Sequence, residues 1–201
     1  AMARRMQSFL NRELISGEAL DVEFEYRKVL PPKAEVIDMI RGKTGALLAF
    51  SAECGAMAGL DTPDWTANPV AALSEFASEL GYAFQLCDDL LGVYGDEAKF
   101  GKPLCSDFRE GKPTVLYLEA LERLTESGRA ELAALMKRPA YAEADIAKIR
   151  SLLEECGARA AVVRAAEESS DKAMANLASL PGTKYRSLLE ELAEELLKRN
   201  V

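Results

Sequence analysis

Residues 81–94 read GYAFQLCDDLLGVY, and this stretch decides the fold. It ends a segment rich in Ala and Leu that runs from Pro69 to about Tyr94, in which apolar residues recur at helical spacing. Two adjacent aspartates, Asp88 and Asp89, lie inside this apolar pattern. Neighbouring carboxylates in partly buried surroundings repel each other and lose hydration, and a bound divalent cation is one compensation. The stretch therefore predicts a long core helix that carries a cation-binding end.

Helical patterns lie on both sides of this segment. A first helical run includes Met6 and Phe24 and is stopped by Pro31, and a second extends from Lys33 to about Gly59. After an irregular stretch over Gly95–Pro113, we expect helices at Val115–Ser127, Tyr141–Cys156, Ala158–Leu177 and Tyr185–Arg199. No alternating strand pattern occurs, so the sequence predicts a single all-α domain over residues 1–201.

The composition excludes several chemistries. The chain has 25 Lys and Arg against 33 Asp and Glu, a net charge of −8, and no histidine. It therefore has no Ser-His-Asp triad, no His-ligated zinc and no imidazole acid or base. An acidic chain binds nucleic acid poorly. No apolar stretch is long enough for a membrane span. Four scattered cysteines without a C-x-x-C pair suggest reduced thiols in a cytoplasmic protein.

The paired aspartates have a polar neighbour on the same helix. Gln85 precedes Asp88 by three residues and Asp89 by four, so all three side chains can share one broad helix face. Oxygen ligands without histidine or thiolate favour Mg²⁺, which also bridges carboxylates to substrate phosphates. An aspartate pair on a helix is, however, more often a solvated face than a metal site.

Lysines that could bind phosphate occur in two other segments. The irregular stretch supplies Lys102, Asp107 and Lys112 among glycines, although loops of this composition commonly have no ligand. Lys43 stands in the second helix, where Gly42 and Gly45 would weaken the helix unless something needs to approach the backbone there.

In combination, these motifs resemble the (E)-prenyl diphosphate synthases. The ordered matches are Lys43-Thr44-Gly45-Ala46-Leu47, Phe84-Gln85-x-x-Asp88-Asp89, Gly95-Asp96, Gly101-Lys102, Asp107 and Gly111-Lys112-x-Thr114, with Gly17-Glu18-x-x-Asp21 upstream. The resemblance implies an isoprenoid-synthase-type helical bundle. It also implies a Mg²⁺-dependent transferase of isoprenoid biosynthesis, which condenses isopentenyl diphosphate head to tail with an allylic diphosphate.

The resemblance also implies roles for individual residues. Asp88, Asp89 and Asp107 would hold or support Mg²⁺. Lys43, Lys102 and Lys112 would bind the allylic diphosphate, while Thr44 and Gln85 would join Lys43 as catalytic residues that face the substrate cation. A homodimer or heterodimer joined through helices is expected by the same analogy.

The sequence departs from the family pattern in ways that change the expectation. Gly92 stands where a third aspartate is common, one turn beyond Asp88, and no Asp-Asp pair precedes Asp88. We therefore expect the C-terminal part of a longer synthase fold that lacks the N-terminal helices, and an isolated chain of poor activity. The alternative is a non-catalytic regulatory subunit of a heteromeric synthase, which exposed apolar faces on the first two helices would favour.

Overall fold

The computed structural model describes residues 1–97, 101 and 103–198, and every regular element in this part of the chain is helical. The all-α prediction is therefore confirmed. The elements are α1 (Met2–Arg5), η1 (Met6–Leu10), α2 (Asn11–Tyr26), α3 (Lys33–Ile40), η2 (Arg41–Gly45), α4 (Ala46–Gly59), α5 (Asn68–Tyr94), α7 (Ser106–Glu110), α8 (Val115–Arg123), α9 (Glu126–Ala134), α10 (Glu143–Glu155), α11 (Ala158–Ala178) and α12 (Lys184–Lys198).

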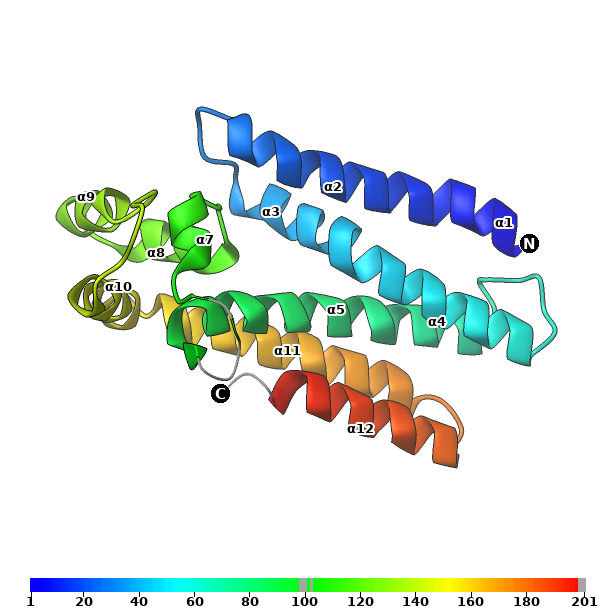
Figure 1. The fold of residues 1–201 in the computed structure, drawn as a ribbon. Coiled ribbons are helices and arrows are strands. Elements are labelled where there is room, and N and C mark those ends of the chain that lie inside the picture. The colour runs from blue at the N-terminus through cyan, green and yellow to red at the C-terminus, as the bar shows by residue number, and fades with distance from the viewer. Residues whose placement is uncertain (98–100, 102, 199–201) are drawn as a thin grey trace.

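The long helices lie side by side, with α5 in the middle (Figure 1). Helix α5 packs against α4 on one side and against α11 on the other, while α2 packs on η2 and α12 covers part of α5 and α11. The short helices α7 to α10 gather at one end of this row, around the C-terminal end of α5 (Figure 1). This arrangement brings the end of α5, where the aspartates lie, next to α7 and α8.

One face of α5 packs in the core, so a functional site must lie on another face of this helix. Tyr82, Leu86, Leu90 and Val93 are buried and recur every three or four residues, so they form one apolar face. They pack in a cluster that also contains residues of α8, α10 and α11. Asp88 lies off this face and is exposed, whereas its neighbour Asp89 is buried.

Two helices contain π-helical turns that the sequence analysis did not predict. The turn η1 joins α1 to α2, and η2 joins α3 to α4 without a break in the helical run. The predicted extent of the second helix, Lys33 to about Gly59, is confirmed. Because η2 inserts a wider turn, it changes the direction in which Lys43 and Thr44 point relative to a regular helix.

Two other predictions about elements were wrong. The stretch Gly95–Pro113, predicted as irregular, contains the helix α7. The helix predicted over Val115–Ser127 ends at Arg123, and a separate helix, α9, follows it. The reason is local: Leu124 is extended, and the Thr125 hydroxyl accepts a hydrogen bond of 3.2 Å from the Gly128 N–H and so begins a new helix.

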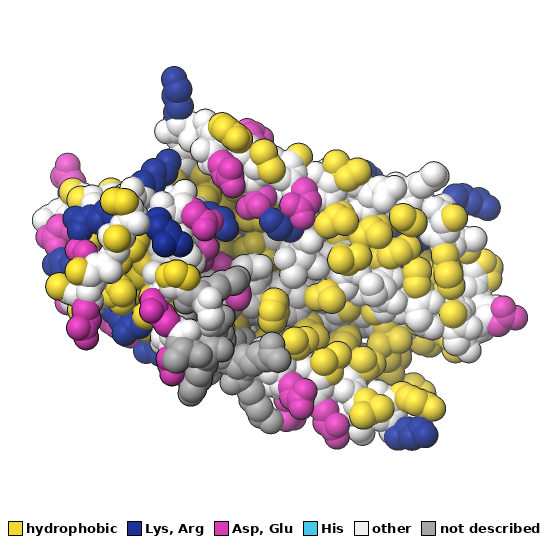
Figure 2. Space-filling view, viewed as in Figure 1, with side chains coloured by type: hydrophobic (Ala, Val, Ile, Leu, Met, Phe, Trp, Pro, Cys, Tyr) yellow, Lys and Arg dark blue, Asp and Glu magenta, His cyan; other side chains and the backbone are white. Residues whose placement is uncertain are grey.

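Large apolar side chains are exposed on the surface of the long helices. Ile15 and Val22 on α2, and Leu47 and Leu48 on α4, are exposed. Figure 2 shows apolar side chains spread over the long-helix face, at the end away from α7 to α10. The apolar exposure on the first two helices, the feature that would favour the alternative of a regulatory subunit, is thus observed. Within the described residues, none of the helices combines the length and apolar character needed to cross a membrane.

Candidate active site

A pocket of about 220 Å³ lies where α2, α3, η2, α5 and α7 meet the start of α8. It collects seven of the eight predicted site residues: Lys43, Thr44, Gln85, Asp88, Asp89, Asp107 and Lys112. The eighth, Lys102, lies outside the described residues. Asp21 also lines the pocket, together with the apolar side chains of Val36, Met39 and Ile40. Segments up to 93 residues apart in sequence (114 − 21) therefore form one cavity.

Glycines at the crossing of α2 and η2 bring Lys43 to the pocket. A Cβ atom on Gly17 would lie 2.3 Å from the backbone nitrogen of Lys43, and one on Gly42 would lie 2.7 Å from the carbonyl oxygen of Glu13. The two backbones are therefore in direct contact, which only glycine permits here. The backbone of α2 approaches at Gly42, which explains a glycine inside this helical run, and this contact sets Lys43 beside α2.

Lys43 is bound to carboxylates of α2. Its Nζ lies 2.6 Å from Oδ2 of Asp21 and 3.4 Å from Oε2 of Glu18. The hydrogen bond with Asp21 raises the pKa of Lys43 above its ordinary value although partial burial opposes this, so the lysine stays charged. Asp21 was not predicted as a site residue. Its signal was the spacing Gly17-Glu18-x-x-Asp21, which places it one turn beyond the close-contact glycine.

Asp89 is the buried member of the aspartate pair. It is 6% exposed, and its Oδ1 accepts a hydrogen bond of 3.1 Å from Nε2 of Gln85. Burial and, to a smaller extent, the nearby charges of Asp107 and Asp88 together raise the pKa of Asp89 to about 8, against the hydrogen bond from Gln85. The three carboxylates are thus close enough to repel one another, and a cation in the pocket would relieve that repulsion.

Helix α7 and the segment directly after it supply Asp107 and Lys112 to the pocket. The helix lies between two left-handed residues, Cys105 with φ 58° and Gly111 with φ 75°, which turn the chain sharply at both ends. Nζ of Lys112 lies 2.8 Å from Oε2 of Glu110 and 3.8 Å from Oδ1 of Asp107. The hydrogen bond with Glu110 raises the pKa of Lys112, so this lysine also carries a positive charge in the pocket.

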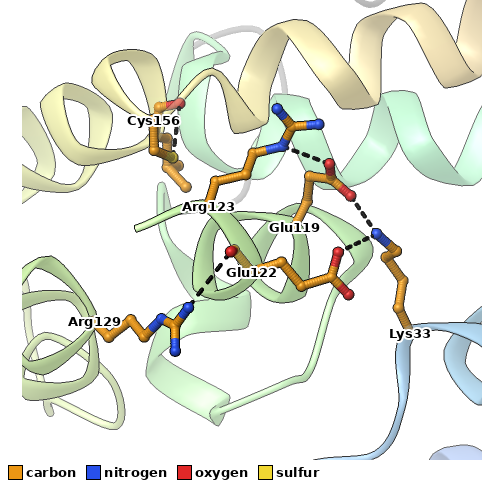
Figure 3. A network of polar contacts seen from close by, with 7 residues as sticks. Lys33, Glu119, Glu122, Arg123, Arg129 and Cys156 are labelled. Atoms are coloured by element: carbon orange, nitrogen blue, oxygen red, sulfur yellow. Dashed lines mark hydrogen bonds and ion pairs between the residues drawn. The ribbon is translucent and has the colours of Figure 1, made fainter. Parts of the chain in front are cut away.

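An ion-pair network fixes α3 relative to α8, whose N-cap residue Thr114 lines the pocket (Figure 3). Nζ of Lys33, at the start of α3, lies 2.6 Å from Glu119 and 2.5 Å from Glu122. Arg123 binds the second oxygen of Glu119 at 2.6 Å. The Thr114 hydroxyl accepts a hydrogen bond from the Tyr117 N–H, which caps α8 just after the segment that contains Lys112.

The donor set suits Mg²⁺ better than any softer metal. Asp88, Asp89 and Asp107 offer only carboxylate oxygens. Across the part of the chain that the structure describes, no three or more His, Cys, Asp or Glu side chains are grouped so as to hold a metal by themselves. A hard cation here would need oxygens from water and from a bound anion, which is the way Mg²⁺ usually binds beside phosphates.

Comparison with known proteins gives one consistent result. The model of the family described as "Polyprenyl synthetase" matches residues 3–153. The geranylgeranyl diphosphate synthase of Saccharolobus solfataricus is 35% identical over 170 residues, which cover 84% of this chain and 49% of that protein. The short chain isoprenyl diphosphate synthase of Methanothermobacter thermautotrophicus is 33% identical over 187 residues, covering 93% of this chain and 55% of that protein.

Solved structures show the same fold. The geranylgeranyl pyrophosphate synthetase of Pyrococcus horikoshii superposes with a TM-score of 0.87 at 32% identity, over 99% of this chain and 58% of that one. A geranylgeranyl pyrophosphate synthase of Corynebacterium glutamicum, complexed with isoprenyl diphosphate and magnesium, gives 0.86 at 30% identity, over 100% and 56%. The chain therefore spans about half the length of the relatives it matches, and the expected isoprenoid-synthase-type helical fold is confirmed over that span.

Proposed function

The chain belongs to the polyprenyl synthetase family, and we propose that it binds the diphosphate of an allylic substrate for prenyl transfer to isopentenyl diphosphate. One observation carries the proposal. Two charged lysines, four aspartates, Thr44 and Gln85, from segments far apart in sequence, line one pocket. Lysines beside hard carboxylates are the donors that a magnesium diphosphate requires.

We infer roles from the position of each group. Lys43 and Lys112 both line the pocket, from η2 and from the segment after α7, and would bind the diphosphate together. Asp88, Asp89 and Asp107 would hold Mg²⁺, which neutralises the diphosphate as it leaves. Thr44 and Gln85 would turn their dipoles toward the positive charge on the allylic carbon.

The proposed reaction needs no histidine. The allylic C–O bond breaks and diphosphate leaves with the electron pair. The double bond of isopentenyl diphosphate then forms the new C–C bond, and loss of a proton restores a double bond in a product five carbons longer. Fixed positive groups stabilise the charge that develops on the leaving diphosphate, which is electrostatic catalysis. Because the sequence has one aspartate pair, at Asp88 and Asp89, we expect the isolated chain to be a poor catalyst.

The alternative of a regulatory subunit receives no support from the comparisons, because the relatives described above are synthases. The exposed side chains on α2 and α4 are the apolar surface that would favour this alternative, and they are the kind of surface that contacts further protein. A helix-to-helix dimer, a cytoplasmic location and membership in a longer domain stay predictions.

Prenyl transfer tests the proposal. A protein that carries this chain is incubated with geranyl diphosphate, radiolabelled isopentenyl diphosphate and Mg²⁺, and labelled product is extracted. We expect Asp88→Ala and Lys43→Ala each to reduce product formation strongly, whereas Lys28→Ala, an exposed lysine away from the pocket, should leave it unchanged. Unchanged rates in the first two variants would contradict the proposed roles. Rapid turnover by the isolated 201-residue chain would show that one aspartate pair suffices.

A further inference from the structure

The segment that brings Lys112 to the pocket ends α7 in a Schellman motif. The N–H of Lys112 donates a hydrogen bond of 2.9 Å to the carbonyl oxygen of Asp107, and the N–H of Gly111 donates one of 3.2 Å to the carbonyl oxygen of Phe108. Gly111 is left-handed, with φ 75°, as this motif requires. The position of Lys112 therefore depends on the conformation of this one turn.

Helix α7 is short, and other segments hold it at both ends. At its start, the N–H of Cys105 donates a hydrogen bond of 2.6 Å to the carbonyl oxygen of Gly92 on α5. At its end, the carbonyl oxygen of Phe108 accepts a second hydrogen bond, of 2.8 Å, from the N–H of Lys137. Lys137 comes shortly after α9. The turn that ends α7 is thus held by a residue from a distant part of the chain.

Lys137 adopts a conformation that is unfavourable for lysine. Its φ is 56°, in the left-handed region that glycine adopts readily. Its side chain lies across the turn of α7, because a Cβ atom added to Gly111 would lie 2.3 Å from Cε and 2.8 Å from Cγ of Lys137. The methylene groups of Lys137 therefore occupy the space that a side chain at position 111 would need. A strained residue of this kind persists only where its surroundings hold it, and here those surroundings include the turn before Lys112.

We propose that Lys137 is a positioning residue for Lys112: its backbone N–H and its methylene groups hold the turn at Gly111, so that Lys112 lines the pocket before a diphosphate binds. The inference rests on the proposed function, because Lys112 is one of the two lysines proposed to bind the diphosphate. Methylene groups make the contact, so the length of the side chain matters and its charge does not. Glycine at position 137 would relieve the backbone strain but would uncover the turn.

Measurements of binding and of stability distinguish this role from a merely structural one. In a protein that carries this chain, binding of inorganic pyrophosphate with Mg²⁺ is measured by calorimetry, and thermal unfolding without ligand by circular dichroism. Lys137→Gly removes both the strain and the methylene groups, whereas Lys137→Met keeps a side chain of similar length and removes the charge. Asp61→Gly is the matched control, because Asp61 is also exposed and left-handed, with φ 47°, and does not line the pocket.

We expect Lys137→Gly to weaken pyrophosphate binding about two- to tenfold, because the turn must then be ordered when the ligand binds. The same variant should unfold at the wild-type temperature or above it, because glycine adopts the left-handed conformation without strain. Lys137→Met and Asp61→Gly should bind pyrophosphate as the wild type does. In a Lys112→Ala background, Lys137→Gly should cause no further loss of affinity, since its effect acts through Lys112.

Four results would overturn the proposal: wild-type affinity in Lys137→Gly, an unfolding temperature that falls together with the affinity, an equal loss in Lys137→Met, or a further loss when Lys137→Gly is added to Lys112→Ala. The third result would assign the effect to the charge of Lys137.

Hydrogen exchange of the Lys112 amide, measured without ligand, tests the turn independently of binding. Exchange should be faster in Lys137→Gly than in the wild type, and an unchanged rate would show that Lys137 does not hold the turn. A wild-type protein that does not bind pyrophosphate would instead refute the proposed function, and amide exchange would still decide whether Lys137 positions Lys112.

Discussion

Nζ of Lys43 lies 2.6 Å from Oδ2 of Asp21, so the lysine proposed to bind diphosphate is already paired with a carboxylate of α2. Both side chains are partly exposed, at 38% for Lys43 and 26% for Asp21. Ion pairs of this exposure contribute about 0–1 kcal/mol to stability. The pair is therefore weak enough to open, and an anion that enters the pocket competes with Asp21 for the ammonium group.

The first prediction concerns this competition. Asp21→Asn should change the free energy of unfolding by less than about 1 kcal/mol. The same change should increase the affinity for metal-free inorganic pyrophosphate severalfold, most clearly at low salt. Isothermal titration calorimetry measures the affinity. Glu18→Gln is the control and should have a smaller effect, because Glu18 lies 3.4 Å from Lys43 and is more exposed. Weaker binding by Asp21→Asn would show that Asp21 orients Lys43 instead.

A second prediction concerns Lys43 itself. Lys43→Ala removes a charged hydrogen-bond donor worth about 1.5–3 kcal/mol, and it should weaken pyrophosphate binding about 10- to 100-fold. Circular dichroism should show the same helix content as the wild type, because Lys43 is not a core residue. Lys28→Ala, which removes an exposed lysine elsewhere, should bind pyrophosphate as the wild type does. Equal loss in both variants would mean that overall charge, and not the pocket, governs binding.

A third prediction tests the backbone contact that places Lys43. Gly17→Ala would put a Cβ atom 2.3 Å from the Lys43 nitrogen, so α2 and η2 must separate. Overpacking of this kind costs about 1–3 kcal/mol, which urea unfolding measures. Gly55→Ala is the matched control: it lies in α4 with open space around it and should stabilise by up to about 1 kcal/mol. Equal stability of the two alanine variants would contradict the close packing of α2 on η2.

A fourth prediction concerns pH and Glu79, which joins three helices. Its side chain is 12% exposed, binds Arg41 of η2 at 2.9 Å and accepts a hydrogen bond of 2.5 Å from the Ser169 hydroxyl of α11. Burial disfavours its ionised form, but the hydrogen bonds from Arg41 and Ser169 outweigh burial and lower the pKa of Glu79 below its ordinary value.

A lowered pKa in the folded state means that Glu79 stabilises the fold above its unfolded-state pKa, and that this contribution disappears as pH falls through the folded-state pKa. Glu79→Gln should therefore reduce the free energy of unfolding by about 1–3 kcal/mol at pH 7. The difference from the wild type should shrink below about pH 4, near the pKa of an unperturbed glutamate. Urea unfolding at pH 7 and pH 3.5 measures both values. A difference that is the same at both pH values would refute a role for the ionised carboxylate.

Local sequence patterns predicted much of the fold, because residues close to one another in sequence determine where these helices form. The apolar periodicity of residues 69–94 marked α5. Pro31 lies beyond the end of the first helical run, because α2 already ends at Tyr26. Elements that depend on a few cap atoms were missed. Helix α9 begins where the Thr125 hydroxyl accepts a hydrogen bond from the Gly128 N–H. Helix α7 lies between two residues in the left-handed conformation, and one of them, Cys105, is not of a type that signals such a turn.

The sequence by itself determined the all-α fold, the residue types of the candidate site and their order along the chain. Only the tertiary structure decided which of these site residues lie close together. The pairing of Lys43 with Asp21 depends on α2 touching the π turn η2 at two glycines, and the location of Asp107 depends on α7 docking at Gly92. Helix periodicity is set by neighbours within four residues, whereas these contacts join residues 13 or more positions apart, and packing of the whole chain selects them.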